Sequence, residues 1–163
     1  MQSVVLLLGS NDSSAADIVK SAIAIIGHSV GSVAKCSAEY RSKAYGFTSE
    51  REFVNRAVEI YTELDAYEVL RRINLIEALL GRDRTIEQQT KELTGEEYAS
   101  RPIDIDIIFY GDKTFADKRL TIPYHFLSER EYALRPVAEI TPDRKHPELE
   151  YTPEQMLHRL TTK

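Results

Sequence analysis

The sequence predicts an α+β fold, and three observations carry that prediction. Short apolar runs typical of strands alternate with segments whose apolar residues recur at the spacing of a helix. The 163 residues are 42% hydrophobic and 29% charged, which is ordinary for a globular protein and sufficient for a hydrophobic core. The chain contains no internal repeat, low-complexity tract or linker-like run. We therefore expect a single domain that comprises residues 1–163.

One strand and one helix come first. Residues 4–8 are a continuous apolar run that leads into the turn residues 9–11, which is typical of a buried strand. We expect Asp12 or Ser13 to cap the following helix, because a short oxygen-bearing side chain can accept a hydrogen bond from a free amide of the first turn. Gly27 is expected to end that helix, since glycine tolerates the left-handed conformation common at helix C-termini.

Two strands and a second helix follow. Residues 33–40 have a weak strand pattern, whereas residues 53–61 have the clear two-residue alternation of a half-buried strand. Asp65 and Glu68 have the spacing of a capping box at the start of a helix. The apolar residues that follow recur at helical spacing as far as Gly81, which we expect to end the helix.

A further strand at residues 103–110 completes the order strand, helix, strand, strand, helix, strand. That order is the ferredoxin-like split βαβ pattern, an antiparallel sheet with helices on one face. The tail adds a short helical segment at residues 128–134 and a final helix after Thr152, where Pro153 and Gln155 complete a start signal. Such folds support many functions, so function must be inferred from individual residues.

Composition excludes several classes of function. The net charge is −5 and no run of Lys or Arg exceeds a pair, so we expect neither a nucleic-acid partner nor a membrane partner. The single Cys36 cannot form an internal disulfide, which favours a reducing, cytoplasmic location. The four histidines lack metal-ligand spacing, which argues against zinc. A monomer is the simplest expectation for the oligomeric state.

Asp104 and Asp106 are the most informative polar residues. Residues two apart in a strand share a face and lie about 6.5–7 Å apart, so these carboxylates should project together. Two hard carboxylates at that separation can bind Mg²⁺, which prefers few carboxylates together with water and substrate phosphate. A solvated polar face is the alternative, and spacing alone favours it. The two negative charges repel each other unless a cation lies nearby, and this makes the metal site a stronger alternative to the solvated face.

Arg82 and Arg84 follow a helix C-terminus directly. Cations are favoured there by the helix dipole, so a structural role is one interpretation. The other is that the two guanidinium groups bind phosphate oxygens. The polar segment between Arg84 and Arg101 is longer than most connections. We expect residues 82–101 to form a lid, although an extra helical turn without function is an alternative.

Seven short segments, taken in order, carry a resemblance to a known family. They are residues 8–11, 40–42, 53–58, 77–82, 101–107, 120–123 and 130–136. Together they resemble the 6-hydroxymethyl-7,8-dihydropterin pyrophosphokinases of folate biosynthesis, over nearly the whole chain. The resemblance implies transfer of pyrophosphate from ATP to the hydroxymethyl group of the reduced pterin, with release of AMP. It also implies long catalytic loops around the ferredoxin-like core.

The resemblance assigns roles to individual residues. Asp104 and Asp106 would hold two Mg²⁺ ions that bridge the ATP phosphates, and Arg82 and Arg101 would be the catalytic clamp on those phosphates. The remaining residues that would bind ATP are Asn74, Glu77, Arg84, Ile107, Arg119, Thr121, Tyr124, His125 and Arg130. The residues that would bind the pterin are Ser42, Tyr45, Phe53, Asn55 and Tyr132, with Phe53 and Tyr132 on opposite sides of the ring.

The sequence departs from the family pattern at several places. Lys43 stands where the family usually has proline, and in Pro123-Tyr124-His125 the histidine is displaced by one position. The chain has no tryptophan, although a tryptophan is often found on the mobile loop of the family. The rival from another class is a ferredoxin-like module that binds a small molecule for regulation without catalysis. That interpretation requires the Asp104 and Asp106 face to be only solvated surface.

Overall fold

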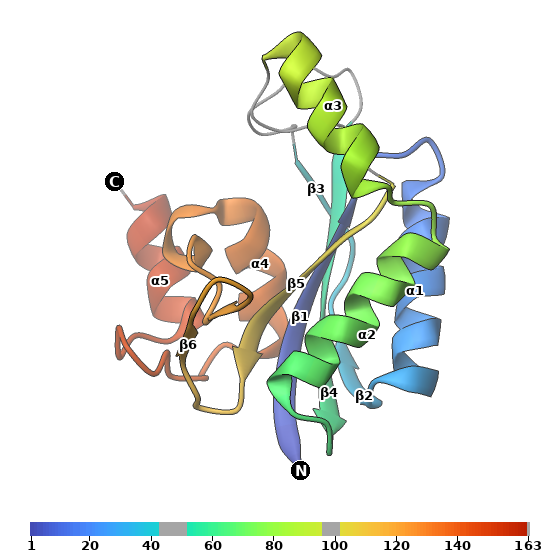
Figure 1. The fold of residues 1–163 in the computed structure, drawn as a ribbon. Coiled ribbons are helices and arrows are strands. Elements are labelled where there is room, and N and C mark those ends of the chain that lie inside the picture. The colour runs from blue at the N-terminus through green and yellow to red at the C-terminus, as the bar shows by residue number, and fades with distance from the viewer. Residues whose placement is uncertain (43–51, 96–101, 163) are drawn as a thin grey trace.

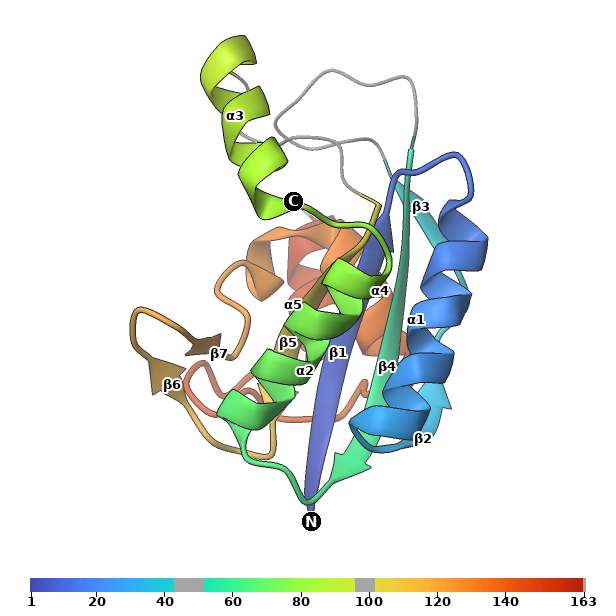
Figure 2. The same cartoon turned by 45° about the vertical axis from the view of Figure 1, so that its right-hand side comes forward.

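The structure, a computed structural model, describes residues 1–42, 52–95 and 102–162. In these residues an antiparallel sheet lies between two layers of helices (Figures 1 and 2). The main strands are β1 (Gln2–Ser10), β2 (Ser32–Cys36), β3 (Tyr40–Ser42), β4 (Phe53–Thr62) and β5 (Asp104–Tyr110). Their order is β2-β4-β1-β5, and β3 also pairs with β4. The ferredoxin-like prediction is confirmed by this order and by the antiparallel pairing.

The helices of the split βαβ repeat cover one face of the sheet. They are α1 (Ala15–Ser29) and α2 (Ala66–Leu79), and both lie on the same side in Figure 1. The sequence predicted helices on one face of the core sheet and did not place the tail helices. The opposite face is covered too, by α4 (Glu131–Ile140) and α5 (Pro153–Thr161) (Figure 1). The reason is that the tail helices present an apolar surface that must be buried, and the sheet face is the surface available.

β1 is a central strand of the sheet, between the two layers of helices. Leu6 and Leu8 belong to the core beneath α1 and α2, whereas Val5 and Leu7 belong to the core beneath α4 and α5. All four are at most 2% exposed. A strand covered on both faces is apolar throughout, which explains the continuous run in the sequence.

Several predicted boundaries are confirmed. Asp65 Oδ1 accepts a hydrogen bond from the amide of Glu68 at 2.8 Å, so it caps α2. Gly81 follows α2 with a φ of 101°, a left-handed conformation that suits glycine. The capping box of α5 is complete, because Thr152 and Gln155 each bond the other's backbone amide.

The predicted start and end of α1 were wrong. Its N-cap is Ser14, which makes no side-chain cap, while Asp12 Oδ1 accepts from the Ser14 amide at 3.0 Å. Gly27 lies within the helix, which continues to Ser29. Glycine is required at position 31 instead, since a Cβ atom there would lie 2.5 Å from the carbonyl oxygen of Tyr61.

The predicted strand at residues 33–40 is divided into β2 and β3. Ser37 separates them: its amide donates to Ala57 O at 2.9 Å, and its Oγ accepts from the Ala57 amide at 2.9 Å. A side-chain oxygen thus takes the place of a backbone carbonyl in the ladder. The predicted segment 128–134 is also different, because a 3₁₀ turn (η1, Leu127–Glu129) leads into α4, which continues past Pro136.

Residues 84–94 form a helix, α3 (Arg84–Thr94), so the segment is helical, as the alternative to a loop allowed, and at 11 residues it is longer than one turn. Asp83 caps it by accepting from the amides of Thr85 and Ile86. α3 projects away from the sheet in Figure 2. A two-stranded ribbon, β6 (Phe115–Ala116) with β7 (Thr121–Ile122), completes the structure. Among the described residues, no helix is long and apolar enough to cross a membrane.

Candidate active site

Asp104, Asp106 and Asn55 lie on one face of the sheet. Asp104 is paired with Gly9, which is also paired with Asn55, and Asp106 is paired with Leu7. Residues directly opposite on neighbouring strands share a face, so the two aspartates project together as the sequence predicts. This is the face that α4 and α5 cover at its other end. The intervening side chains are buried, as expected: Ile103, Ile105 and Ile107.

Gly9 leaves room for the side chain of Asn55. A Cβ atom at Gly9 would lie 2.7 Å from Asn55 Oδ1 and 3.9 Å from Phe53 Cδ1. Asn55 is 3% exposed, and its Nδ2 donates to Ser42 Oγ at 3.3 Å. The structure therefore brings Ser42, Phe53 and Asn55 together, three of the residues assigned to the pterin. Tyr45 lies outside the described residues.

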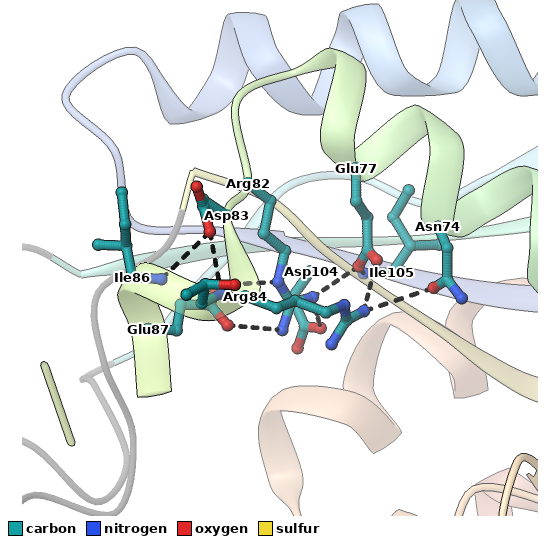
Figure 3. A network of polar contacts seen from close by, with 10 residues as sticks. Asn74, Glu77, Arg82, Asp83, Arg84, Ile86, Glu87, Asp104 and Ile105 are labelled. Atoms are coloured by element: carbon teal, nitrogen blue, oxygen red, sulfur yellow. Dashed lines mark hydrogen bonds and ion pairs between the residues drawn. The ribbon is translucent and has the colours of Figure 1, made fainter. Parts of the chain in front are cut away.

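Arg82 lies at the centre of a network of carboxylates (Figure 3). Its Nη1 donates to Glu77 Oε2 at 2.7 Å and to Asp104 Oδ1 at 2.9 Å, and its Nε donates to Glu87 Oε1 at 2.9 Å. Its side chain is 4% exposed, whereas that of Asp104 is 32% exposed. Burial tends to lower the pKa of Arg82, but Asp104, Glu87 and Glu77 outweigh it and raise the pKa, so the cation persists.

Glu77 anchors this network to the sheet. Its Oε2 also accepts from the backbone amide of Ile105 at 2.8 Å, which lies between the two aspartates in sequence. Its Oε1 accepts from Arg84 Nη2 at 2.8 Å. Burial raises the pKa of Glu77, and the charge of Arg82 opposes that rise. Because both carboxylate oxygens bond within the protein, Glu77 holds Arg82 and Arg84 rather than facing open space.

Arg84 and Asn74 lie at the surface beside Glu77 (Figure 3). Arg84 is 60% exposed, and its Nη2 lies 3.4 Å from Asn74 Oδ1. Three residues assigned to ATP thus form one cluster next to Arg82. Arg101 lies outside the described residues, and the lid at residues 82–101 stays a prediction.

A hollow of about 160 Å³ opens beside Asp106. Apolar side chains form most of its walls, and Asp106, Arg119, Thr121 and Tyr124 supply polar groups. Such a hollow suits a flat ring that is attached to a charged group. The residues that line it are Leu70, Ile73, Ile105, Asp106, Ile107, Arg119, Leu120, Thr121 and Tyr124. Four of these were assigned to ATP by the resemblance, namely Ile107, Arg119, Thr121 and Tyr124.

Four lining residues were not among the predicted site residues, namely Leu70, Ile73, Ile105 and Leu120. The helical spacing of Leu70 and Ile73 places them on the buried face of α2, which is the ordinary signal of a core residue. Their position at the end of the core, next to β5, cannot be distinguished from the core by periodicity alone.

Tyr124 and Tyr132 are joined through their hydroxyl groups, whose oxygen atoms lie 3.1 Å apart. Tyr132 belongs to the first turn of α4. Burial raises the pKa of Tyr124, and the negative charge of Asp106 raises it further. Tyr124 therefore stays protonated at neutral pH and keeps a proton for hydrogen bonding.

His125 and Arg130 do not line the hollow. His125 is exposed and meets Phe126 edge-on, with ring centroids 4.9 Å apart. The Arg130 guanidinium lies 4.7 Å from the centroid of the same Phe126 ring. The tyrosine of the Tyr124-His125 pair is thus the member that faces the hollow. The assignment of His125 and Arg130 to ATP stays a prediction.

A larger hollow, about 430 Å³, lies at the N-terminus of α1. Its polar side chains include Arg41 and the carboxylates of Asp12, Asp17 and Glu52. An acidic lining does not suit a triphosphate, because like charges repel.

The carboxylates of Asp104 and Asp106 suit magnesium. Both are partly exposed, share a face and supply hard oxygen ligands. In the described part of the chain no group of three or more His, Cys, Asp or Glu side chains could hold a metal. Two carboxylates, with substrate oxygens and water as the remaining ligands, are the arrangement that Mg²⁺ uses with phosphates.

The fold and this site define a class of protein. A carboxylate pair, a buried arginine bonded to it and an adjacent apolar hollow are what an enzyme that transfers a phosphate-containing group from a nucleotide requires. The family model described as 7,8-dihydro-6-hydroxymethylpterin-pyrophosphokinase (HPPK) matches residues 5–142. The chain belongs to this family, and the resemblance noted in the sequence is confirmed.

Curated relatives carry the name 2-amino-4-hydroxy-6-hydroxymethyldihydropteridine pyrophosphokinase. The one from Methylorubrum extorquens is 36% identical over 83% of this chain and 80% of its own length. The one from Aquifex aeolicus is 32% identical over 90% of this chain and 85% of its own. The one from Synechocystis is 35% identical over 83% of this chain, which covers 65% of that relative. These names favour an enzyme over a regulatory module.

Solved structures support the fold. Plasmodium falciparum HPPK-DHPS, wild type with pteroate, matches 97% of this chain with a TM-score of 0.74 at 15% identity. This chain spans 44% of that solved chain, which is a longer protein.

Proposed function

We propose that this protein transfers pyrophosphate from ATP to the hydroxymethyl group of 6-hydroxymethyl-7,8-dihydropterin in folate biosynthesis and releases AMP. The observation that carries the proposal is the common face of Asp104, Asp106 and Asn55, next to an apolar hollow and to Arg82. On that face one substrate can lie over the carboxylates while the other lies over Asn55.

The nucleotide occupies the hollow beside Asp106 in this proposal. Ile107 packs against the base, while Thr121 and Arg119 bind its polar edge and its sugar or phosphates. Two Mg²⁺ ions bound to Asp104, Asp106 and the triphosphate would supply charge neutralisation and alignment of the phosphates. The carboxylates fix where the β-phosphate lies relative to the sheet, which is the main requirement of phosphoryl-type transfer.

Arg82 and Arg101 stabilise the charge that develops during transfer. Arg82 is held beside Asp104 by Glu77, so its guanidinium is positioned before the substrate arrives. The hydroxymethyl oxygen forms a bond to the β-phosphorus as the bond from that phosphorus to the bridging α–β oxygen breaks. The hydroxyl group loses its proton to water, and AMP leaves with the bridging oxygen.

The pterin lies over the Gly9 and Asn55 end of the same face. Asn55 and Ser42 read its donor and acceptor groups, and Tyr45 contributes from the neighbouring segment. Phe53 and Tyr132 stack on the two sides of the ring. Because α4 packs against β4, Tyr132 can reach the face that carries Phe53. We further propose a cytoplasmic location, which the lone Cys36 supports.

The test is a product assay with purified protein, ATP, Mg²⁺ and the reduced hydroxymethylpterin. We expect AMP and the pterin pyrophosphate in equal amounts, and no reaction when EDTA replaces Mg²⁺. Formation of ADP with a monophosphorylated pterin, or ATP consumption that is independent of the pterin, would contradict the proposal.

A further inference from the structure

Tyr124 lines the hollow proposed for the nucleotide and also contacts Tyr132, which is assigned to the pterin. One side of it lines the hollow with Asp106 and Thr121. Its backbone amide donates to Ile108 O at 3.1 Å, which fixes its position relative to β5. The ring of Phe126 meets the Tyr124 ring edge-on at 6.1 Å. The residue is therefore held from two directions, and its hydroxyl faces Tyr132 on α4.

The hydroxyl of Tyr124 meets that of Tyr132 at 3.1 Å. Tyr132 is in the first turn of α4, and α4 packs against β4, the strand that carries Asn55 and Phe53. Both tyrosines are half-buried. A chain of contacts thus runs from the hollow beside Asp106, through two hydroxyl groups, to the helix that packs against the strand of Asn55.

We propose that Tyr124 is a positioning residue that couples the two substrates: nucleotide in the hollow fixes Tyr124, whose hydroxyl then fixes Tyr132 for the pterin. This inference rests on the proposed function and goes beyond it, because it assigns a physical connection between the two subsites. The hydrogen bond is specific to the pair of tyrosines in this chain, since phenylalanine at either position would remove it while keeping the ring.

Thermodynamic linkage requires that the effects of nucleotide and pterin on each other's affinity be equal. If nucleotide raises the affinity for the pterin by some factor, the pterin must raise the affinity for nucleotide by the same factor. A single hydrogen bond contributes on the order of a 3- to 10-fold change in an equilibrium constant. The coupling that passes through the two hydroxyl groups should therefore lie in that range.

The experiment is a double-mutant cycle on full-length protein with Tyr124→Phe, Tyr132→Phe and the double variant. Calorimetry measures the Kd of the pterin with and without α,β-methylene-ATP and Mg²⁺, and the Kd of the nucleotide alone. We expect each single variant to lose about 3- to 10-fold of the coupling, with nucleotide affinity alone changed less than about 2-fold. The double variant should lose no more coupling than either single variant.

Steady-state kinetics provide a second reading on the same proteins. At saturating ATP, KM for the pterin should rise in both single variants, with a much smaller change in kcat. Tyr151→Phe is the matched control, because Tyr151 is exposed and stacks with Arg159 instead. Thermal unfolding curves that match wild type exclude a general loss of structure, and either single variant suffices if the other fails to fold.

The outcomes separate the two proposals. Coupling that survives both single variants, or losses that simply add in the double variant, would overturn the role of Tyr124. Wild-type protein that binds both ligands without any coupling would overturn it as well, with the proposed reaction intact. Wild-type protein that binds neither ligand and forms no AMP would remove the proposed function, on which this inference rests.

Discussion

The two faces of the sheet differ in how far along β1 their side chains remain apolar. Toward α1 and α2, apolar side chains continue through Leu8, near the end of β1. Toward α4 and α5, they stop at Leu7, and Gly9 follows on that face. Beside Gly9 lie Asp104 and Asn55, on the neighbouring strands. The face toward α1 and α2 therefore stays apolar along β1 as far as Leu8, with the hollow beside Asp106 at its β5 edge, whereas the other face changes from core to polar site within a single strand.

The comparison shows how a small fold can separate stability from chemistry. Away from that hollow, the face toward α1 and α2 (the closed face) can supply hydrophobic burial without contacting the site, and α4 closes only part of the other face. A substitution on the closed face should change stability with little effect on the reaction. A substitution at the polar end of the other face should do the opposite.

The largest expected effect on turnover is at the aspartates. In Asp104→Asn and Asp106→Asn, we expect kcat to fall about 10³-fold or more, because metal charge stabilisation of the transition state is worth several kcal/mol. The fold should persist, since both side chains are partly exposed. Steady-state AMP formation and thermal unfolding measure the two quantities. Near-wild-type turnover of either variant at saturating Mg²⁺ would argue that the polar end is only solvated surface.

A substitution at Gly9 tests whether the pterin binds where Gly9 leaves space beside Asn55. In Gly9→Ala the new Cβ would lie 2.7 Å from Asn55 Oδ1, so Asn55 must move. Losing its contacts to the pterin should raise KM for that substrate about 5- to 150-fold, with KM for ATP unchanged.

Gly27→Ala is the matched control for this substitution. A Cβ at Gly27 would meet only Val33 Cγ2, at an ordinary 3.6 Å. If Gly9→Ala raises KM for ATP as much as KM for the pterin, or raises neither, Gly9 has no specific role in pterin recognition.

Glu87 links α3 to Arg82, and it tests the lid. Its side chain is 11% exposed and pairs with a guanidinium that is 4% exposed. In Glu87→Gln, amides of α3 should exchange about 10-fold faster without nucleotide, because a charge-assisted contact is lost. The difference should shrink once triphosphate and Mg²⁺ are added, since phosphate then binds the arginine.

Glu92→Gln is the control on the same helix, because Glu92 is exposed and contacts Gln88 instead. If the α3 amides exchange hydrogen at the same rate in wild type and in Glu87→Gln, Glu87 does not hold α3 against Arg82.

The smallest expected effect on turnover is on the closed face. Leu6 is fully buried there, so Leu6→Ala should lower the free energy of unfolding by about 2–5 kcal/mol. The kcat and KM per folded molecule should stay close to wild type at a temperature where the variant is folded. Denaturant titration combined with active-site-normalised kinetics checks both parts. A large change in KM would mean that the two faces are not separated as described.

The sequence predicted the core order of strands and helices and the common face of Asp104 and Asp106, because both depend on local periodicity; it did not predict α3, β6 or β7. It did not predict the network around Arg82, since the contacts of Glu77 and Glu87 with one guanidinium depend on how α2, α3 and β5 meet in space. Asp83 and Gly95 are the cap signals that would have defined α3, yet the polar composition between them favoured a loop. The role of Gly9 also depends on a neighbouring strand.

The central claim is that the phosphates and the pterin lie on the face that carries Asp104, Asp106 and Asn55, while the base enters the hollow at the β5 edge of the sheet. The most direct measurement is a crystal structure of this protein with α,β-methylene-ATP, Mg²⁺ and 6-hydroxymethylpterin. The account predicts the base in the hollow beside Asp106, the metal on the two aspartates and the pterin over Asn55. A nucleotide bound in the larger hollow at the N-terminus of α1, or a pterin away from Asn55, would contradict it.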